Sequence, residues 1–147
     1  MLRHSATILI AAAPQRVFAY LADVSRHPEW AGDELRIEPL DDGPVRLDWR
    51  FRSVGRQLGA RADLNVVSEF DPPWGLAFEV DGNEGRFRNS FVLEEANAGT
   101  RLTKTFESLE TRGLARLAQL VYPLIAAPTM RRDLKRIKER LERSSAE

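Results

Sequence analysis

One long amphipathic stretch near the end of the chain constrains the fold more than any other feature of the sequence. Between Gly113 and Arg143, apolar residues recur at steps of three and four, which places them on one face of a helix. This apolar line consists of Leu117, Leu120, Leu124, Ala127, Met130, Leu134, Ile137 and Leu141. A helix of this length is stable when its apolar face packs on another element, so the rest of the chain is expected to supply that surface.

The first half of this stretch is apolar over a wider arc than the second half. A second apolar line, Leu114, Val121, Ile125 and Pro128, occurs only there. Because a wide arc requires packing on two sides, we expect residues 114–128 to lie deep against the rest of the chain and residues 129–143 to lie across its edge. Pro123 and Pro128 lack a backbone N–H, so a kink or short break is expected near them.

Basic residues cluster on the second half of the predicted helix. They are Arg131, Arg132, Lys135, Arg136, Lys138, Arg140 and Arg143. Cations suit a solvated helix face and a helix C-terminus, so we expect them in water. The alternative is contact with an anionic membrane, which would be transient, or with nucleic acid, since such clusters also bind anionic surfaces.

The earlier part of the chain begins with one predicted strand and two short helices. Ser5 to Ile10 reads as the first strand, and Ala12 to Ala22 as a helix with Pro14 in its first turn. Asp23 to Trp30 is predicted to be a second short helix or turn, for which Ser25 is a suitable N-cap.

From Leu35 onward, turn signals separate runs in which apolar and charged residues alternate. The apolar positions assigned to one face are Leu47, Trp49, Phe51, Leu64, Val66, Phe70, Leu76, Phe78, Val80, Phe87, Phe91, Leu93, Leu102 and Phe106. Short loops between such runs indicate neighbouring antiparallel strands. We therefore predict an α+β helix-grip fold, with a curved seven-stranded antiparallel sheet wrapped around the long C-terminal helix and two short helices between strands 1 and 2.

Composition excludes several classes of protein and site. The 147 residues fit a single domain, 1–147, and the zero net charge gives no reason to expect nucleic acid as a partner. Cysteine is absent and only His4 and His27 are present, which leaves no disulfide, no thiolate nucleophile and no multi-histidine metal site. We expect no metal and no cofactor.

The N-terminus does not favour secretion. Residues 6–13 are apolar, but the preceding basic region is minimal and Pro14 opens a helix directly afterwards. No apolar run approaches the roughly 20 residues needed to span a bilayer. A cytoplasmic protein is the expectation.

Local motifs resemble those of one superfamily. Ile10–Asp23 is similar to its first strand and helix, Arg26–Trp30 to its "peW" turn, and Asp71–Pro73 and Gly99–Thr103 to its later turn and strand. The whole chain thus resembles the START-like or SRPBCC superfamily, which includes polyketide cyclase/dehydrase-like proteins and lipid-transfer domains. The resemblance implies a cavity between sheet and helix that binds an apolar small molecule or lipid. These motifs are structural, so they do not identify the ligand.

Candidate cavity residues follow from the inward face of the predicted sheet and helix. The set comprises Trp49, Phe51, Ser68, Phe78, Phe87, Asn89, Phe91, Lys104, Leu117 and Val121, with Trp30, Asp33 and Glu34 at the mouth. The aromatic members line a pocket or simply fill the core. Asn89 either makes an internal hydrogen bond or contacts a ligand, and Lys104 either turns to water at a bulge or edge or faces the cavity.

Catalytic signatures are absent from the sequence. No nucleophile elbow, zinc-binding helix or phosphate loop is present, and no catalytic residue is predicted. Alternation places Asp48, Asp63, Glu69, Glu79 and Asp81 on the outer face, away from the cavity. His27 lies in a turn, where we expect it to cap or pack locally and not to act as a general base.

Three functions remain open at this point. The favoured one is binding of an apolar or amphipathic small molecule as a carrier, sensor or chaperone. The others are a polyketide cyclase or dehydratase, and an interaction domain with a vestigial cavity. The sequence leaves the oligomeric state undetermined.

Overall fold

The computed structural model describes residues 2–31, 35–55, 61–83, 85–113, 117 and 121–145. In chain order the elements are β1 (Arg3–Ile10), α1 (Pro14–Ala22), the 3₁₀-helix η1 (Val24–Glu29), β2 (Arg36–Pro39), β3 (Arg50–Gly55), β4 (Arg61–Asp71), β5 (Gly75–Gly82), β6 (Gly85–Ala96), β7 (Gly99–Thr111) and α3 (Tyr122–Ser145).

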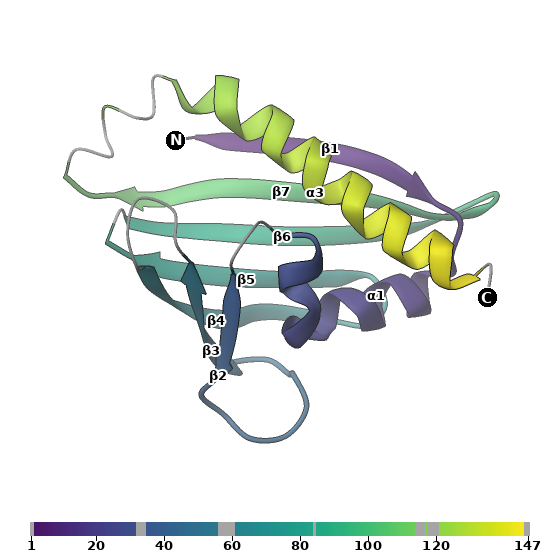
Figure 1. Ribbon diagram of the computed structural model, residues 1–147, viewed down its shortest axis with the longest axis horizontal. Helices are drawn as coiled ribbons and strands as arrows, with labels where there is room; N and C mark the ends of the chain where they lie inside the picture. Colours follow the sequence, from purple (N-terminus) through teal and green to yellow (C-terminus); the bar gives the residue numbers. More distant parts are fainter. Residues whose placement is uncertain are drawn as a thin grey trace.

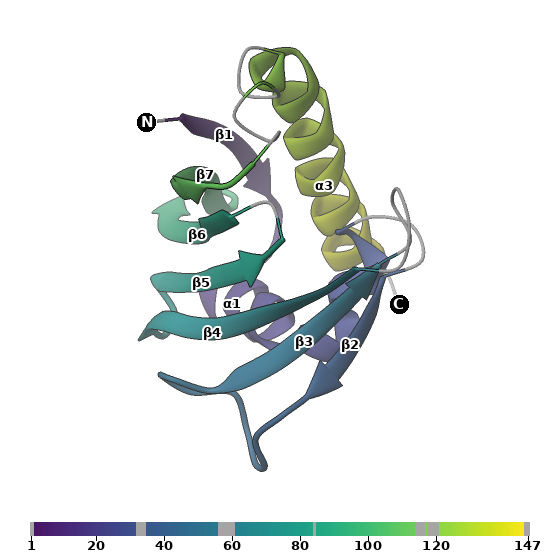
Figure 2. The same ribbon diagram turned by 90° about the vertical axis from the view of Figure 1, so that its left-hand side faces the viewer.

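The strands form one antiparallel sheet in the order β1-β7-β6-β5-β4-β3-β2. Strands β2 to β7 are a meander, and β1 closes onto β7 at the opposite edge (Figure 1). Figure 2 shows the sheet curving from β1 round to β2, with α3 across its open side. The predicted helix-grip fold is therefore confirmed.

The two short helices occupy the chain between β1 and β2, as predicted. Pro14 stands at the start of α1, where its missing N–H leaves no helical hydrogen bond unmade. Val17, Phe18 and Leu21 of α1 are buried against the sheet, and Phe18 packs edge-on against Phe70 of β4 with ring centroids 5.5 Å apart. These contacts place η1 over the concave face of the sheet.

The C-terminal part of α3 packs as the sequence predicts. Met130, Leu134, Ile137 and Leu141 are at most 4% exposed, and the helix lies against β1. The basic residues Arg131, Arg132 and Lys135 point to water on the other side. A single packed face thus suffices for this half of the helix.

The burial predicted for residues 114–128 is wrong at most of the apolar positions that the structure describes there, although Ala126 is buried at 6% exposure. Leu117, Val121, Leu124 and Ile125 are 67%, 49%, 78% and 60% exposed. Helical spacing places Leu124 and Ile125 on the side of α3 that faces away from Met130, Leu134 and Ile137. Figure 1 also shows the first turns of α3 reaching beyond the edge strand β1. The break expected near Pro123 agrees with the turn at Val121, just before α3. Pro128 lies inside α3. Leu114 and Leu120 fall outside the described residues.

Strand β4 departs from the predicted alternation. Its register against β5 shifts between Val67 and Glu69, where Ser68 forms a β-bulge. Before the bulge Asn65 and Val67 face the interior, at 6% and 0% exposure, in place of the predicted Leu64 and Val66. Because a bulge inserts one residue, it exchanges the two faces of a strand, and sequence alternation alone does not reveal it.

Two smaller findings complete the fold. Leu47, which the alternation assigned to the inner face, lies before β3 and is 54% exposed. Among the described residues, no helix is long and apolar enough to cross a membrane.

Candidate functional site

A cavity of about 280 Å³ lies between the concave face of the sheet, η1 and α3. Its wall includes residues from η1, the segment that follows it, strands β2 to β7, and one residue of α3. The lining residues are His27, Trp30, Ala31, Leu35, Ile37, Phe51, Ser53, Asp63, Asn65, Phe78, Val80, Phe87, Asn89, Phe91, Lys104, Phe106 and Asp133. This volume is close to the lower end of the range for small-molecule sites.

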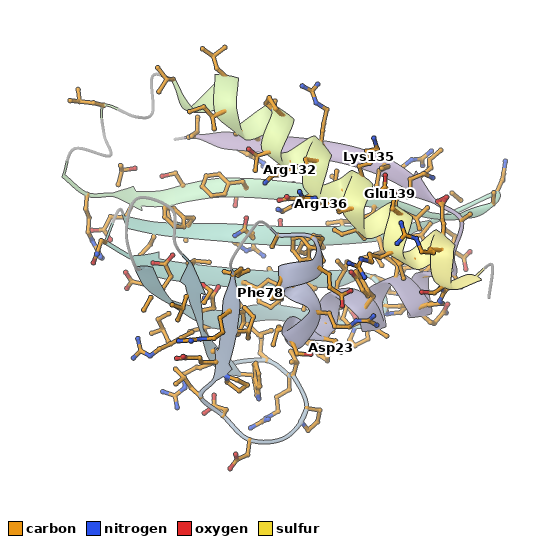
Figure 3. All side chains as sticks on the ribbon, in the orientation of Figure 1. Asp23, Phe78, Arg132, Lys135, Arg136 and Glu139 are labelled. Atoms are coloured by element: carbon orange, nitrogen blue, oxygen red, sulfur yellow. The ribbon has the colours of Figure 1, made fainter. Side chains whose placement is uncertain are left out.

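Aromatic rings form most of the apolar wall. The rings of Phe51 on β3 and Phe78 on β5 pack edge to face, with their centroids 5.7 Å apart. The rings of Trp30 and Phe91 pack in the same way, also with centroids 5.7 Å apart. Figure 3 shows Phe78 projecting beside η1. Edge-to-face packing favours particular relative orientations of such rings, so the wall is preformed apart from small rotations of single side chains.

A buried ion pair crosses the cavity wall from the sheet to the helix. Lys104 Nζ donates to Asp133 Oδ2 at 3.1 Å, and the two side chains are only 11% and 6% exposed. The same ammonium lies 5.2 Å from the ring centroid of Trp30 and 5.9 Å from that of Phe91, within the range of cation–π attraction. The pair ties β7 to α3, and its burial excludes the water-facing alternative for Lys104.

His27 is a buried part of the same wall. Its ring lies 4.9 Å from that of Trp30 and 5.3 Å from that of Phe78. Nε2 is 2.9 Å from the carbonyl oxygen of Leu21, and because a carbonyl only accepts, Nε2 carries the proton and donates. Burial lowers the pKa of His27 to about 4, so the ring is neutral at pH 7.

A second polar group occupies the β3–β4 side of the cavity. Asn65 Nδ2 donates to Ser53 Oγ at 2.9 Å and to the Asp63 carbonyl oxygen at 3.1 Å. Asp63 also lines the cavity, contrary to the prediction that it faces outward, because the Ser68 bulge reverses the alternation of this strand.

The structure brings together seven of the predicted site residues: Trp30, Phe51, Phe78, Phe87, Asn89, Phe91 and Lys104. Asn89 is half-buried, and no other described residue hydrogen-bonds its side chain. Trp49 is buried beside Phe51 and does not line the cavity, and Ser68 lies at the bulge. Leu117 and Val121 are exposed and away from it, and Asp33 and Glu34 lie outside the described residues.

Sequence reasoning missed the role of Asp133 although a signal was present. Asp133 stands three residues after Met130 and four before Ile137, on the buried face of α3. A carboxylate at such a position needs a buried partner, and Lys104 was the one cation assigned to the inner face of the sheet. Pairing the one carboxylate on the buried face of the helix, Asp133, with Lys104 would have predicted this ion pair. No comparable signal in the sequence marked Asn65 or Asp63 as cavity residues.

Comparisons with known proteins agree with this geometry. The sequence model described as "Polyketide cyclase / dehydrase and lipid transport" matches residues 1–143. A search of curated proteins gave no match.

Solved structures share the fold at low sequence identity. A protein of unknown function from Staphylococcus aureus superposes with a TM-score of 0.78 at 12% identity, covering 99% of this chain and 96% of its own. A protein from Thermus thermophilus superposes with a TM-score of 0.75 at 21% identity, over 98% of this chain and 99% of the other. A protein from Chromobacterium violaceum superposes with a TM-score of 0.75 at 14% identity, over 97% of this chain and 99% of the other. At these identities the likeness establishes the fold alone.

Proposed function

Because the chain belongs to the polyketide cyclase/dehydrase and lipid transport family, we propose that it binds a small apolar or amphipathic molecule in the cavity between sheet and α3, as a carrier, sensor or chaperone. The observation that carries this proposal is the preformed aromatic wall around about 280 Å³ of space. Rings held by their neighbours do not collapse into such a space, so a ligand gains contacts that the empty protein lacks.

The cavity favours a compact ligand. Its volume suits one or two fused rings or a short chain more than a lipid with two long chains. Aromatic faces provide apolar contact, and the few polar groups, among them Asn89 and Lys104, orient the molecule.

Titration with bicyclic aromatic compounds, quinones and short-chain fatty acids tests the proposal, with tryptophan emission as the signal. Trp30 lines the cavity whereas Trp49 does not, so Trp30→Phe should remove most of the response and Trp49→Phe should retain it. Binding at tens of micromolar or tighter, roughly −6 kcal/mol, is expected. Absence of binding across all three classes would favour the interaction-domain alternative.

Turnover distinguishes a carrier from an enzyme. Lys104, Asp133 and His27 share the cavity wall and offer polar groups to a reactive ligand. Incubation with a poly-β-ketone and analysis of products by mass spectrometry should return the ligand unchanged. Cyclised or dehydrated product that is lost in Lys104→Met would support a cyclase or dehydratase.

A second activity, transient docking on an anionic membrane, is favoured by the outward face of α3. Val121, Leu124 and Ile125 expose apolar side chains at its start, and Arg132 and Lys135 are exposed in the middle turns of the helix (Figure 3). Helical spacing places these five residues on the side opposite the packed face. An apolar segment followed by cations suits insertion among acyl chains beside anionic headgroups.

Vesicle co-sedimentation tests this docking. Vesicles containing phosphatidylglycerol should bind the protein and pure phosphatidylcholine vesicles should bind it weakly. Leu124→Ser with Ile125→Ser should abolish binding, and Arg132→Gln with Lys135→Gln should reduce it and its salt dependence. Equal binding to both kinds of vesicle, or concentration-dependent self-association that the serine variant removes, would overturn the membrane assignment.

A further inference from the structure

The polar end of the cavity contains two buried atoms that lack hydrogen-bond partners. Asp133 Oδ1 accepts from no described donor, and Trp30 Nε1 donates to no described acceptor. Both residues are only 4% exposed and both line the cavity. Buried polar atoms are nearly always hydrogen-bonded, so two exceptions in one cavity wall require an explanation.

Asp133 and Trp30 both flank Lys104 in the cavity wall. The Lys104 ammonium bonds the other carboxylate oxygen of Asp133 and lies over the Trp30 ring at 5.2 Å from its centroid. Arg132 is the other cation near Asp133, and its Nη2 is 3.7 Å from Oδ1, which is beyond hydrogen-bond distance. The carboxylate therefore has one satisfied and one unsatisfied oxygen.

The missing partners define a chemical group. Asp133 Oδ1 requires a donor, and Trp30 Nε1 requires an acceptor. A hydroxyl group both donates and accepts a hydrogen bond, whereas an ether or ketone oxygen only accepts. A carboxylate ligand also lacks a donor, and it would bring a second negative charge to a site where Asp133 already balances Lys104.

We propose that the cavity selects a neutral ligand with a hydroxyl group, an alcohol or a phenol, which donates to Asp133 Oδ1 and accepts from Trp30 Nε1. This inference rests on the proposed ligand-binding function and names the class of ligand. Neither atom touches water in the empty cavity, so binding includes a small rotation of the carboxylate and the indole about their terminal torsions. Such torsions have broad minima, which makes the rotation easy.

Three naphthalene derivatives of nearly equal size test the proposal by isothermal titration calorimetry at pH 7. 2-Naphthol has the donor and the acceptor, 2-methoxynaphthalene has only the acceptor, and 2-naphthoate is an anion without a donor. We expect 2-naphthol to bind about tenfold to a hundredfold more tightly than the ether, the range for a hydrogen bond to a charged group. The naphthoate should bind more weakly than 2-naphthol.

Variants locate the preference. The double variant Lys104→Met/Asp133→Leu replaces the ion pair by apolar side chains, so it should lose the preference for 2-naphthol over the ether. Glu139→Gln, an exposed carboxylate of the same helix, is the matched control and should behave as the wild type. Circular dichroism establishes that each variant is folded.

Indole N–H signals in an NMR spectrum report where the ligand sits. The Trp30 signal should move on binding of 2-naphthol, while that of Trp49, whose Nε1 is also buried and unpaired but lies outside the cavity, should stay in place. Trp30→Phe and Trp49→Phe assign the two signals.

The outcomes separate this inference from the general function. Equal affinity for 2-naphthol and its ether, or tightest binding of the naphthoate, overturns the hydroxyl proposal and leaves ligand binding intact. If none of the three compounds binds while a quinone or a short-chain fatty acid does, the hydroxyl proposal fails and ligand binding stands; if none of these classes binds, the proposed function fails with it. These wild-type measurements decide the question even if the double variant does not fold.

Discussion

Leu124 and Ile125 in the first turns of α3, and Leu134 and Ile137 in its packed half, are all apolar and meet opposite environments. Ile125 is 60% exposed and Leu124 is 78% exposed, whereas Ile137 and Leu134 are 0% and 2% exposed. The polar residue Asp133 reverses the rule, because it lies buried among these residues at 4% exposure. Within one helix, side-chain polarity and burial are therefore decoupled twice.

This contrast teaches what periodicity can and cannot predict. A helical repeat states which residues share a face, and in α3 that statement holds along the packed half. It does not state which turns have a sheet beneath them. In the first turns of α3, Ala126 on the packed side is buried, whereas Leu124 and Ile125 face away from the sheet and are left for another surface or for water. Figure 1 shows these turns reaching beyond β1.

The same substitution at two isoleucines gives the largest expected difference. Ile137→Asp places an unpaired charge in the core and should unfold the protein, whose total stability is expected to be about 5–15 kcal/mol. Ile125→Asp alters an exposed side chain and should change stability by less than about 0.5 kcal/mol. Thermal melts followed by circular dichroism measure both, and equal losses would place the first turns of α3 in the core.

Removal of the buried carboxylate should cost nearly as much. Asp133→Leu leaves Lys104 charged and unpaired, and the expected loss is about 3–5 kcal/mol of unfolding free energy. Lys104→Met/Asp133→Leu removes both charges and should recover most of that stability. Urea denaturation of the three proteins is the measurement; a double variant no more stable than Asp133→Leu would show that the pair does more than balance its own charges.

The pH dependence of stability tests whether His27 in the cavity wall is as buried as the packed half of α3. The pKa of His27 is about 4 in the folded protein against an ordinary value of 6.5, so the unfolded chain binds the proton first as pH falls. Unfolding free energy should therefore decrease between pH 6.5 and pH 4, by at most about 3 kcal/mol, and should not change through His27 above pH 7.

Comparison with a histidine variant isolates this effect from carboxylate titration. His27→Gln has no ring to protonate, so its stability should vary less between pH 7 and pH 4.5 than that of the wild type. Urea titrations of both proteins at the two pH values provide the difference. Parallel losses in the two proteins would mean that His27 is accessible to protons in the folded state.

The smallest effect is expected at the polar rim of the packed half. Lys138 Nζ donates to the Leu9 carbonyl oxygen at 2.7 Å and to Glu142 Oε2 at 2.6 Å, and its side chain is 37% exposed. Lys138→Gln should cost less than about 1 kcal/mol, as for most exposed ion pairs. A loss of several kcal/mol of unfolding free energy in a urea titration would mean that Lys138, more than Leu134 and Ile137, stabilises the packing of α3 on β1.

Most of the fold could be predicted because it follows from local patterns. Alternating residues such as Leu76, Phe78 and Val80 indicate a strand with one buried face, and all three are buried. The turn signals gave the meander, and the steps of three and four gave the C-terminal helix. Each of these signals lies within a few residues of the element that it predicts.

The site was predicted only in part because its polar half depends on contacts between distant residues. Phe91 and Lys104 were assigned to the inner face from alternation, but the partner of Lys104 is 29 residues away on a different element. Asp63 and Asn65 enter the cavity only because one inserted residue at Ser68 reverses the strand. A bulge leaves no fixed mark in the sequence, since it is determined by how β4 pairs with β5.

The sequence by itself determined the strand order along the chain, the packed face of α3 from Met130 to Leu141, and the aromatic character of the cavity, because these depend on the spacing of apolar residues. Only the tertiary structure decided which apolar residues remain exposed, which face of β4 lines the cavity, and that Asp133 meets Lys104. The physical reason is geometric. Burial requires an opposing surface, and the angle between α3 and β1 and the register of β4 against β5 determine where that surface lies.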